Sequence, residues 1–197
     1  MIENIFPTKI FVNTLDIEFS YKQTIISYIE NFFLKDIDLQ HSLEKGGKST
    51  FSVMNDLHCI DNFKPLVNSI EKNIKDYWNC LDFDPNYVPY IDTMWANEHK
   101  FQDYTNWHAH STHILSGVFY LKFPRSGGNI VFYNPLEYHT HYYPLNINTR
   151  NKFLQTIIEV VENVCIIFPS HLKHKTEPNF SQSSRLCIAF NINYKKK

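Results

Sequence analysis

The sequence of 197 residues has little excess charge of either sign, and this weighs against several classes of partner. Nineteen Lys and Arg stand against twenty Asp and Glu, so the formal net charge is -1 at pH 7. No broad basic field is available to attract a nucleic acid backbone. A short basic run, YKKK, ends the sequence, and we expect it to be a solvated terminus.

Long apolar runs and paired cysteines are also missing. No apolar run reaches the length of about 20 residues that a transmembrane helix needs, and the opening MIENIFPTKIFVN lacks the pattern of a signal peptide. The four cysteines form no Cys-x-x-Cys pair. Cys165 and Cys187 lie in apolar strand-like runs, where a cysteine usually acts as a small buried hydrophobe. We therefore expect a cytoplasmic protein of a reducing compartment, without a membrane partner.

The chain is rich in aromatic residues, and its pattern changes near residue 84. Segments 21–34 and 61–79 space their apolar residues at helical intervals, with Asp61 as the expected cap of the second helix. Beyond residue 84, short β-branched and aromatic runs alternate with turn residues. Two helices followed by many antiparallel strands indicate a β-sandwich or a jelly roll with helices on one face. Strands are expected at 5–13, 88–98, 114–123, 129–133, 153–160, 164–168 and 185–193.

No internal repeat or low-complexity linker divides the sequence, so we expect one domain over residues 1–197. Its first part, 1–84, is the expected helical support, and 85–197 is the expected jelly-roll core. Residues 137–152 (EYHTHYYPLNINTRNK) look like a long loop, of the kind that often serves as a functional lid. His139 and His141 in this segment repeat an H-x-H spacing, which we interpret as a solvated or substrate-facing loop.

Histidines at two distant places in the chain suggest a metal site. In NWHAHSTHILSGVFYLKF, His108 and His110 have the alternating spacing that places two side chains on one face of a strand. A third donor is expected from IIFPSHLKHKTEPN, which holds His171 and His174. An open site with three ligands suits an oxygen-activating iron, whose usual ligands are two histidines and one carboxylate. Arg185 opens the next strand, and an inward-facing arginine needs an anion such as a dicarboxylate.

Five sequence pieces, in order, resemble a known family. They are IFPTKIF, then HAHSTHILSGVFYL, the turn SGGNIVF, FPSHLKHKTEPN and finally SSRLCIAFN. Together they cover nearly the whole chain and resemble the 2-oxoglutarate/Fe(II) oxygenase family found in marine bacteria and their phages. The resemblance implies a location in the cytoplasm of a bacterial or phage-infected host cell. That family is similar to the prolyl-4-hydroxylase-like branch of its superfamily. The resemblance implies a double-stranded β-helix with two N-terminal helices packed on one sheet.

The resemblance also implies roles for particular residues. His108 matches the first metal ligand and His174 the distal one, while His110 stands where the wider superfamily has Asp or Glu. The site would then hold three histidines and one negative charge fewer, which leaves the iron more electropositive. Arg185 matches the residue that anchors the far carboxylate of 2-oxoglutarate.

Four further residues are expected around the cosubstrate and the substrate. The resemblance places Tyr120 where a tyrosine often touches the same carboxylate of 2-oxoglutarate, and Asn97 where related enzymes offer a polar group. His113 stands at a position that is usually small and polar, and is expected either to line the substrate channel or to be the second ligand. Trp95 is expected in the pocket wall.

The implied function is that of a Fe(II)- and 2-oxoglutarate-dependent dioxygenase, most naturally a hydroxylase. Such an enzyme couples the oxidative decarboxylation of 2-oxoglutarate to succinate and CO₂ with the oxidation of a C–H bond, using O₂ as oxidant. A small molecule or a peptide would be the substrate, and the sequence does not choose between them. Two alternatives stay open: a cupin-like three-histidine dioxygenase that needs no 2-oxoglutarate, and a non-catalytic jelly-roll module that binds a metal.

Overall fold

Two α-helices precede most of the strands in the computed structural model, which describes residues 7–35, 37–136 and 154–197. Helix α1 spans Phe19–Phe33 and α2 spans Lys64–Cys80, close to the expected bounds. The prediction that Asp61 caps α2 is wrong. Asp61 opens a 3-10 turn, η2 (Asp61–Phe63), and Phe63 occupies the cap position without a side-chain hydrogen bond. The Asp61 carboxylate instead pairs with Lys64 Nζ at 2.6 Å.

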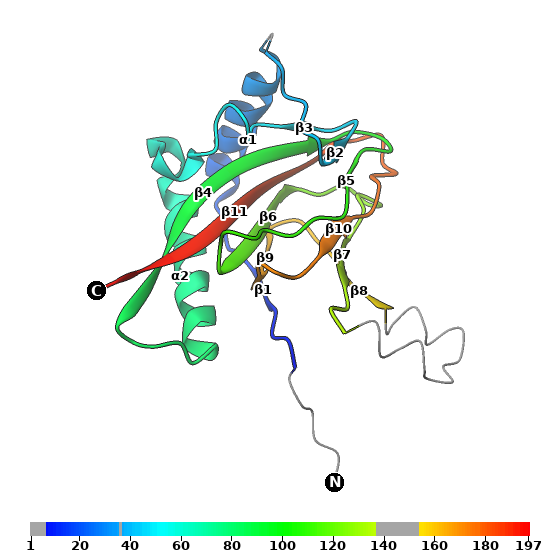
Figure 1. Ribbon diagram of the computed structural model, residues 1–197. Coiled ribbons are helices and arrows are strands. Elements are labelled where there is room, and N and C mark those ends of the chain that lie inside the picture. Colours follow the sequence, from blue (N-terminus) through cyan, green and yellow to red (C-terminus); the bar gives the residue numbers. More distant parts are fainter. Residues whose placement is uncertain (1–6, 36, 137–153) are drawn as a thin grey trace, which may run out of the picture.

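The strands form two main antiparallel sheets and a small two-stranded ribbon. The six-stranded sheet has the order β1-β9-β6-β11-β4-β3, the three-stranded sheet β10-β7-β8, and the ribbon β2-β5. Figure 1 shows the helices on one side of the large sheet and the small sheet on the other. This arrangement confirms the predicted jelly roll with helices packed on one sheet. The strands are β1 (Phe11–Thr14), β2 (Glu44–Lys45), β3 (Lys48–Ser49), β4 (Tyr87–His99), β5 (Tyr104–Thr105), β6 (Leu115–Lys122), β7 (Ile130–Tyr133), β8 (Gln155–Ile158), β9 (Val164–Pro169), β10 (His174–Thr176) and β11 (Arg185–Lys196).

The large sheet is buried on both faces, which explains the nearly continuous apolar runs of its central strands. In β6, Phe119 and Leu121 pack with the helices, whereas Val118 and Tyr120 face the small sheet. Strands β9 and β11 alternate in the same way. Cys165 and Cys187 are fully enclosed in these two cores, as the sequence predicted.

A glycine in the middle of β6 makes room for an aromatic ring. Gly117 lies opposite Phe190 of β11, and a Cβ atom on Gly117 would lie 2.3 Å from Phe190 Cζ. The Ile166 carbonyl oxygen of β9 would be 3.0 Å away from the same atom. Three neighbouring strands can therefore enclose the Phe190 ring only because position 117 has no side chain.

The expected strands differ from the observed ones mainly at short elements. Strands β2, β3, β5 and β10 contain two or three residues each and were not predicted. The opening strand begins at Phe11, and the first residues of its predicted range are outside the described part. The predicted loop 137–152, with His139 and His141, also lies outside the described residues. Within the described ranges, no helix combines the length and apolar character needed to cross a bilayer.

Candidate metal centre

His108 and His110 lie in the connection between β5 and β6, and not on a regular strand as the sequence suggested. Only His108 pairs with another segment in strand fashion, through an isolated antiparallel bridge to His174 at the start of β10. The His110 amide donates to the Ser170 carbonyl at 2.9 Å. The connection between β5 and β6 is thus held against the turn that follows β9.

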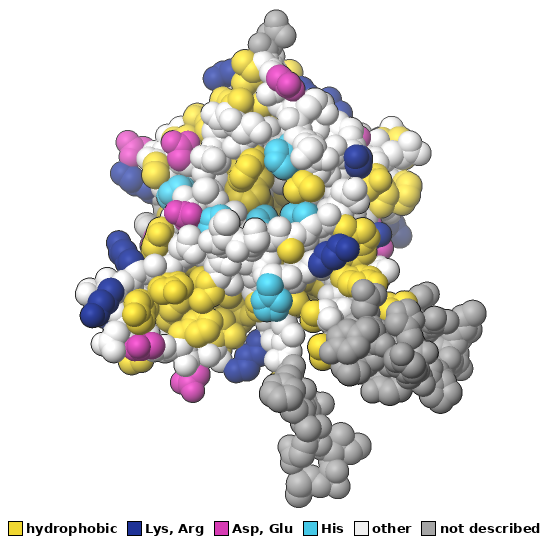
Figure 2. Space-filling view, viewed as in Figure 1, with side chains coloured by type: hydrophobic (Ala, Val, Ile, Leu, Met, Phe, Trp, Pro, Cys, Tyr) yellow, Lys and Arg dark blue, Asp and Glu magenta, His cyan; other side chains and the backbone are white. Residues whose placement is uncertain are grey.

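This backbone arrangement brings three imidazoles together. The candidate ligand atoms of His108, His110 and His174 all lie within 4.8 Å of one another. The His108 and His174 ring centroids are 4.2 Å apart, and those of His110 and His174 are 5.4 Å apart. In the face shown in Figure 2, histidine side chains gather around a hollow. His171 and His113 do not belong to this cluster.

Hydrogen bonds orient two of the three rings toward a shared point. The Nδ1 atoms of His108 and His174 lie 2.8 Å from the carbonyl oxygens of Asn106 and Leu172, respectively. A carbonyl only accepts, so each Nδ1 carries the proton and each Nε2 keeps a free lone pair. Metal-binding histidines are commonly fixed by such a bond from the second nitrogen.

Burial keeps the three imidazoles neutral. Loss of water lowers the pKa of His108, His110 and His174. Neighbouring histidines add to this effect at His174 and at His110, where the pKa falls to about 3. Neutral imidazole is the form that binds a metal ion, so the cluster is available as a ligand set at physiological pH.

The three histidines line a cavity of about 210 Å³. Apolar side chains of β6, β7 and β9, among them Val118, Ile130 and Phe168, form much of the wall. An aromatic row also lines the cavity, with ring centroids 5.3 Å apart from His41 to Phe51 and 4.9 Å apart from Phe51 to Trp95.

Trp95 and His113 were both expected near the substrate, but only one of them lines the cavity. Trp95, on β4, lines the cavity. His113 is not among the lining residues, and its Nε2 lies 2.9 Å from Asp92 Oδ2.

Polar groups gather at another part of the cavity. Tyr120 and Thr176 line it, and Arg185 lies directly behind Thr176, donating from Nη2 to its hydroxyl at 2.9 Å. A second guanidinium nitrogen, Nη1, donates to the carbonyls of Gly127 and Gly128 at 2.7 and 2.9 Å. Arg185 is fully buried, and no salt bridge joins it to a carboxylate of the described residues.

Two buried polar atoms here have no hydrogen-bonding partner. They are the Tyr120 hydroxyl and Arg185 Nε, both enclosed and unpaired within the described part of the chain. Native proteins leave few such groups unsatisfied, because each costs about 1–3 kcal/mol. A positive charge and a free hydroxyl donor, both buried, are the features expected of a site for a carboxylate.

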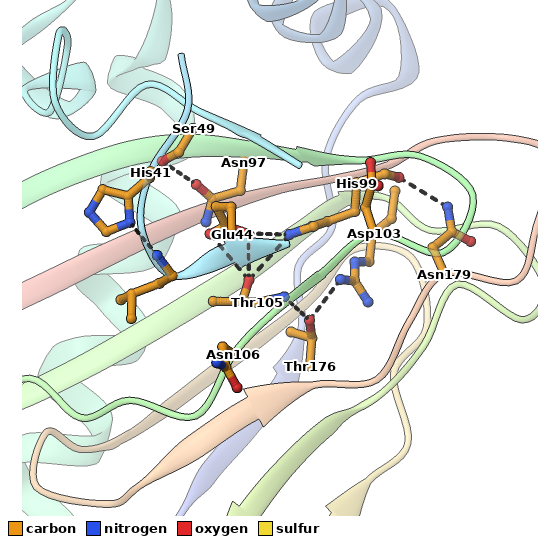
Figure 3. Close-up of polar contacts among 12 residues, drawn as sticks. His41, Glu44, Ser49, Asn97, His99, Asp103, Thr105, Asn106, Thr176 and Asn179 are labelled. Carbon is orange, nitrogen blue, oxygen red and sulfur yellow. Dashed lines mark hydrogen bonds and ion pairs between the residues drawn. The ribbon is translucent and has the colours of Figure 1, made fainter. Parts of the chain in front are cut away.

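A buried carboxylate that the sequence did not reveal also lines the cavity. Glu44 of β2 lies 2.5 Å from His99 Nε2 through Oε2, and Thr105 Oγ1 donates to the same oxygen at 3.0 Å. Figure 3 shows this group beside Asn97, the expected cosubstrate neighbour. Asn97 lines the cavity, and its Oδ1 accepts from Ser49 Oγ at 2.7 Å. Glu44 is in a two-residue strand, which is too short to show a periodic pattern.

A comparison with models of known protein families shows to which family this chain belongs. A family model described as "Putative 2OG-Fe(II) oxygenase" matches residues 93–191, about half of the sequence. The chain belongs to this 2OG-Fe(II) oxygenase family. The matched range begins in β4 and ends in β11, and so includes the three histidines and Arg185. No curated protein matches the sequence.

Solved structures share the fold of this oxygenase. A prolyl-4-hydroxylase from Pseudomonas putida has a TM-score of 0.62 at 9% identity, covering 94% of this chain and 93% of that one. HygX from Streptomyces hygroscopicus, solved with nickel, 2-oxoglutarate and hygromycin B, has a TM-score of 0.62 at 10% identity and covers 94% and 83%. The viral collagen prolyl hydroxylase from Paramecium Bursaria Chlorella virus-1 has a TM-score of 0.57 at 13% identity and covers 92% and 94%.

Family membership gives the chain an enzyme class, the 2-oxoglutarate-dependent oxygenases, with Fe(II) as metal and 2-oxoglutarate as cosubstrate. The side chains of this oxygenase fit both groups. Three neutral imidazoles with convergent nitrogens suit a divalent transition metal. The unpaired Tyr120 hydroxyl and the buried charge of Arg185 suit an anionic cosubstrate.

Proposed function

We propose that this oxygenase is a hydroxylase whose iron is held by His108, His110 and His174. The observation that carries this proposal is the convergence of three neutral imidazoles, within 4.8 Å of one another, on the wall of one cavity. All three proposed ligands are nitrogen donors that line this cavity. The remaining metal positions would face the cavity, where a cosubstrate and O₂ can bind.

The far carboxylate of 2-oxoglutarate is proposed to lie at Tyr120 and Thr176, with Arg185 behind them. Tyr120 would donate its unpaired hydroxyl, and the guanidinium would supply the compensating positive charge. Asn97 would offer its amide to the metal-proximal part of the cosubstrate, since it lines the same cavity. Its fixed orientation comes from the Ser49 hydroxyl.

Iron and 2-oxoglutarate, when bound, supply the oxidising chemistry, in which O₂ converts 2-oxoglutarate to succinate and CO₂ while a substrate C–H bond is hydroxylated. The protein contributes position and exclusion of water. The apolar wall keeps the reaction site dry, and the aromatic row of His41, Phe51 and Trp95 offers a surface for the substrate.

The substrate is proposed to insert a small group and to leave its larger part outside. A cavity of about 210 Å³ must also hold 2-oxoglutarate, so only a side chain or a compact end of a molecule can enter. Structures of the same fold contain a small molecule in one case and a peptide in another: HygX binds hygromycin B, and a Trichoplax adhaerens prolyl hydroxylase binds a peptide fragment.

Four free cysteines are consistent with the proposed reducing, cytoplasmic compartment.

An anaerobic titration tests this function. Fe(II) is added to metal-free protein, followed by 2-oxoglutarate, and the weak visible charge-transfer band of a chelated 2-oxo acid is recorded. We expect the band to saturate at about one equivalent. Iron binding without the band would favour a three-histidine dioxygenase that needs no 2-oxoglutarate. Absence of iron binding would favour a non-catalytic module.

Two alanine variants make the test specific to the proposed ligands. His174→Ala should abolish metal binding and the band. His171→Ala is the matched control, because this histidine lies three positions earlier in the same segment, is exposed and is outside the cluster. An iron affinity that survives in His174→Ala would exclude this ligand.

A further inference from the structure

Among the described residues, no Lys or Arg side chain contacts the buried carboxylate of Glu44. Glu44 is 8% exposed and lines the same cavity as the three histidines. Its Oε2 atom lies 2.5 Å from His99 Nε2, and its other side-chain partner is the neutral hydroxyl of Thr105. Burying an ionised carboxylate without compensation is costly, so its place on the cavity wall calls for an explanation.

His99 does not neutralise this charge. Its Nε2 donates to Glu44, and its Nδ1 is buried without a partner. A protonated ring would have to bury an unsatisfied N–H at Nδ1, whereas a neutral ring with its proton on Nε2 buries only an unused acceptor. Burial and the nearby Arg185 charge lower the pKa of His99, which agrees with a neutral ring. The pair therefore carries one net negative charge.

The local backbone is built to place Glu44 against His99. After Glu44 the chain turns at Gly46 and Gly47, and a Cβ atom on Gly47 would lie 2.8 Å from His99 Cδ2. Gly46 has a positive φ of 84°, and a Cβ atom there would lie 2.1 Å from Asp103 Oδ1. Two glycines are thus needed to bring strand β2 close enough for the contact.

We propose that Glu44 supplies, from the cavity wall, the negative charge that iron sites with a carboxylate ligand receive from that ligand. This inference rests on the proposed metal site. With three neutral imidazoles, Fe(II), dianionic 2-oxoglutarate and the Arg185 cation leave a net positive charge in a buried cavity. An ionised Glu44 cancels it, and charges inside a low-dielectric site interact strongly. Glu44 acts here through the field and is not a metal ligand.

If Glu44 compensates charge, its replacement should change the affinities for the metal and for 2-oxoglutarate in different ways, whereas a purely structural role would change both in the same way. Glu44→Gln keeps the side-chain shape but removes the charge. Its affinity for Mn(II) should fall about tenfold or more, because a nearby negative charge is lost. The affinity of the metal-loaded variant for 2-oxoglutarate should stay equal or rise, because an anion then enters a more positive cavity. A loss of packing would weaken both affinities together.

A sharper test removes the negative charge of Glu44 and introduces a negative charge at a different position. In the Glu44→Gln background, His110→Asp returns one negative charge directly to the metal, and the Mn(II) affinity should recover toward the wild-type value. Glu44→Asp, which retains the charge, should bind Mn(II) far better than Glu44→Gln. Glu98→Gln is the matched control, because it removes the same charge from a β4 residue between Asn97 and His99 that does not line the cavity.

The measurements are Mn(II) binding by electron paramagnetic resonance and 2-oxoglutarate binding by calorimetry, with thermal melts to confirm folding. The inference is overturned if Glu44→Gln weakens 2-oxoglutarate and Mn(II) alike, or if it behaves as Glu98→Gln does. It is also overturned if His110→Asp fails to restore Mn(II) binding. A wild-type protein that binds no divalent metal would instead reject the proposed function, and this inference with it.

Discussion

His108 and His174 exchange a pair of backbone hydrogen bonds. The His108 amide donates to the His174 carbonyl at 2.9 Å, and the His174 amide returns a bond to the His108 carbonyl at 2.8 Å. Their rings therefore extend from one antiparallel bridge. The backbone sets the spacing of these two imidazoles before any metal arrives, so replacing a ring should leave the positions of the remaining ones almost unchanged.

Tyr120→Phe should separate folding from cosubstrate binding. The Tyr120 hydroxyl is buried and unpaired among the described groups, so its removal should leave the free energy of unfolding unchanged or raise it by up to about 1 kcal/mol. If the hydroxyl binds 2-oxoglutarate, the same change should weaken the cosubstrate about 5-fold to 10-fold. Urea denaturation and calorimetry measure the two effects. An unchanged 2-oxoglutarate affinity would remove Tyr120 from the anchor.

Arg185→Ala should raise the requirement for 2-oxoglutarate steeply while leaving Fe(II) binding nearly intact. The guanidinium supplies the buried positive charge behind Thr176. Arg185 would act on the carboxylate through its charge and through the Thr176 hydroxyl to which it donates. Loss of a charge-assisted interaction costs about 1.5–3 kcal/mol, or about a tenfold to hundredfold loss of affinity. The dissociation constants of both ligands are measured on the same preparation.

The control for this change must allow for packing, because Arg185 also bonds the Gly127 and Gly128 carbonyls. Arg185→Lys keeps a positive charge and much of the volume, and a thermal melt reports whether each variant is folded. If a folded Arg185→Ala protein retains the wild-type requirement, the cosubstrate anchor lies elsewhere.

The metal-free protein should lose stability in acid partly through His110. Burial, together with the neighbouring His108 and His113, lowers the pKa of this ring from 6.5 to about 3 in the folded state. Between these values the unfolded chain binds a proton that the folded chain does not, so stability falls as the pH falls below about 6.5. Near pH 5, His110→Gln should therefore reduce proton uptake on unfolding by about one proton, or about 1.4 kcal/mol per pH unit in the slope of stability.

Urea denaturation of metal-free protein at several pH values measures that slope. His171→Gln is a suitable control, because the His171 side chain is exposed and its imidazole meets water in both states. Equal slopes for the wild type and His110→Gln would mean that the His110 ring is already charged in the folded, metal-free protein.

Gly117→Ala should destabilise the fold without touching a ligand. The new methyl group would lie 2.3 Å from the Phe190 ring and 3.0 Å from the Ile166 carbonyl. Overpacking of this kind usually costs about 1–3 kcal/mol. Phe190→Leu should recover part of the loss in the double variant, because it shortens the side chain that is struck. Thermal melts measure both effects, and additive losses would show that the two residues do not interact.

The sequence allowed the long elements and the three clustered histidines to be predicted, but not the shortest strands. Helices α1 and α2 and strands β4, β6 and β11 carry strong local patterns, and HAH and FPSHLKH place their histidines in order along the chain. Glu44 and Thr105 belong to two-residue strands, β2 and β5, which pair with each other. No local propensity encodes such a pair, because its partners come from distant parts of the chain.

Neighbouring residues of β11 face opposite sides of the large sheet, and this helps to fix the register in which the strand pairs with its neighbours. Arg185 and Cys187 face the cavity side, while Leu186 and Ile188 pack under the helices. A shift of one position would place the Arg185 guanidinium in the core beneath the helices and the Leu186 side chain on the cavity side of the sheet. Because Leu186, Cys187 and Ile188 are all apolar, Arg185 is the residue in this stretch that distinguishes the two faces of β11. The arginine that is proposed to compensate the charge of the cosubstrate therefore also disfavours a shift of the strand by one residue.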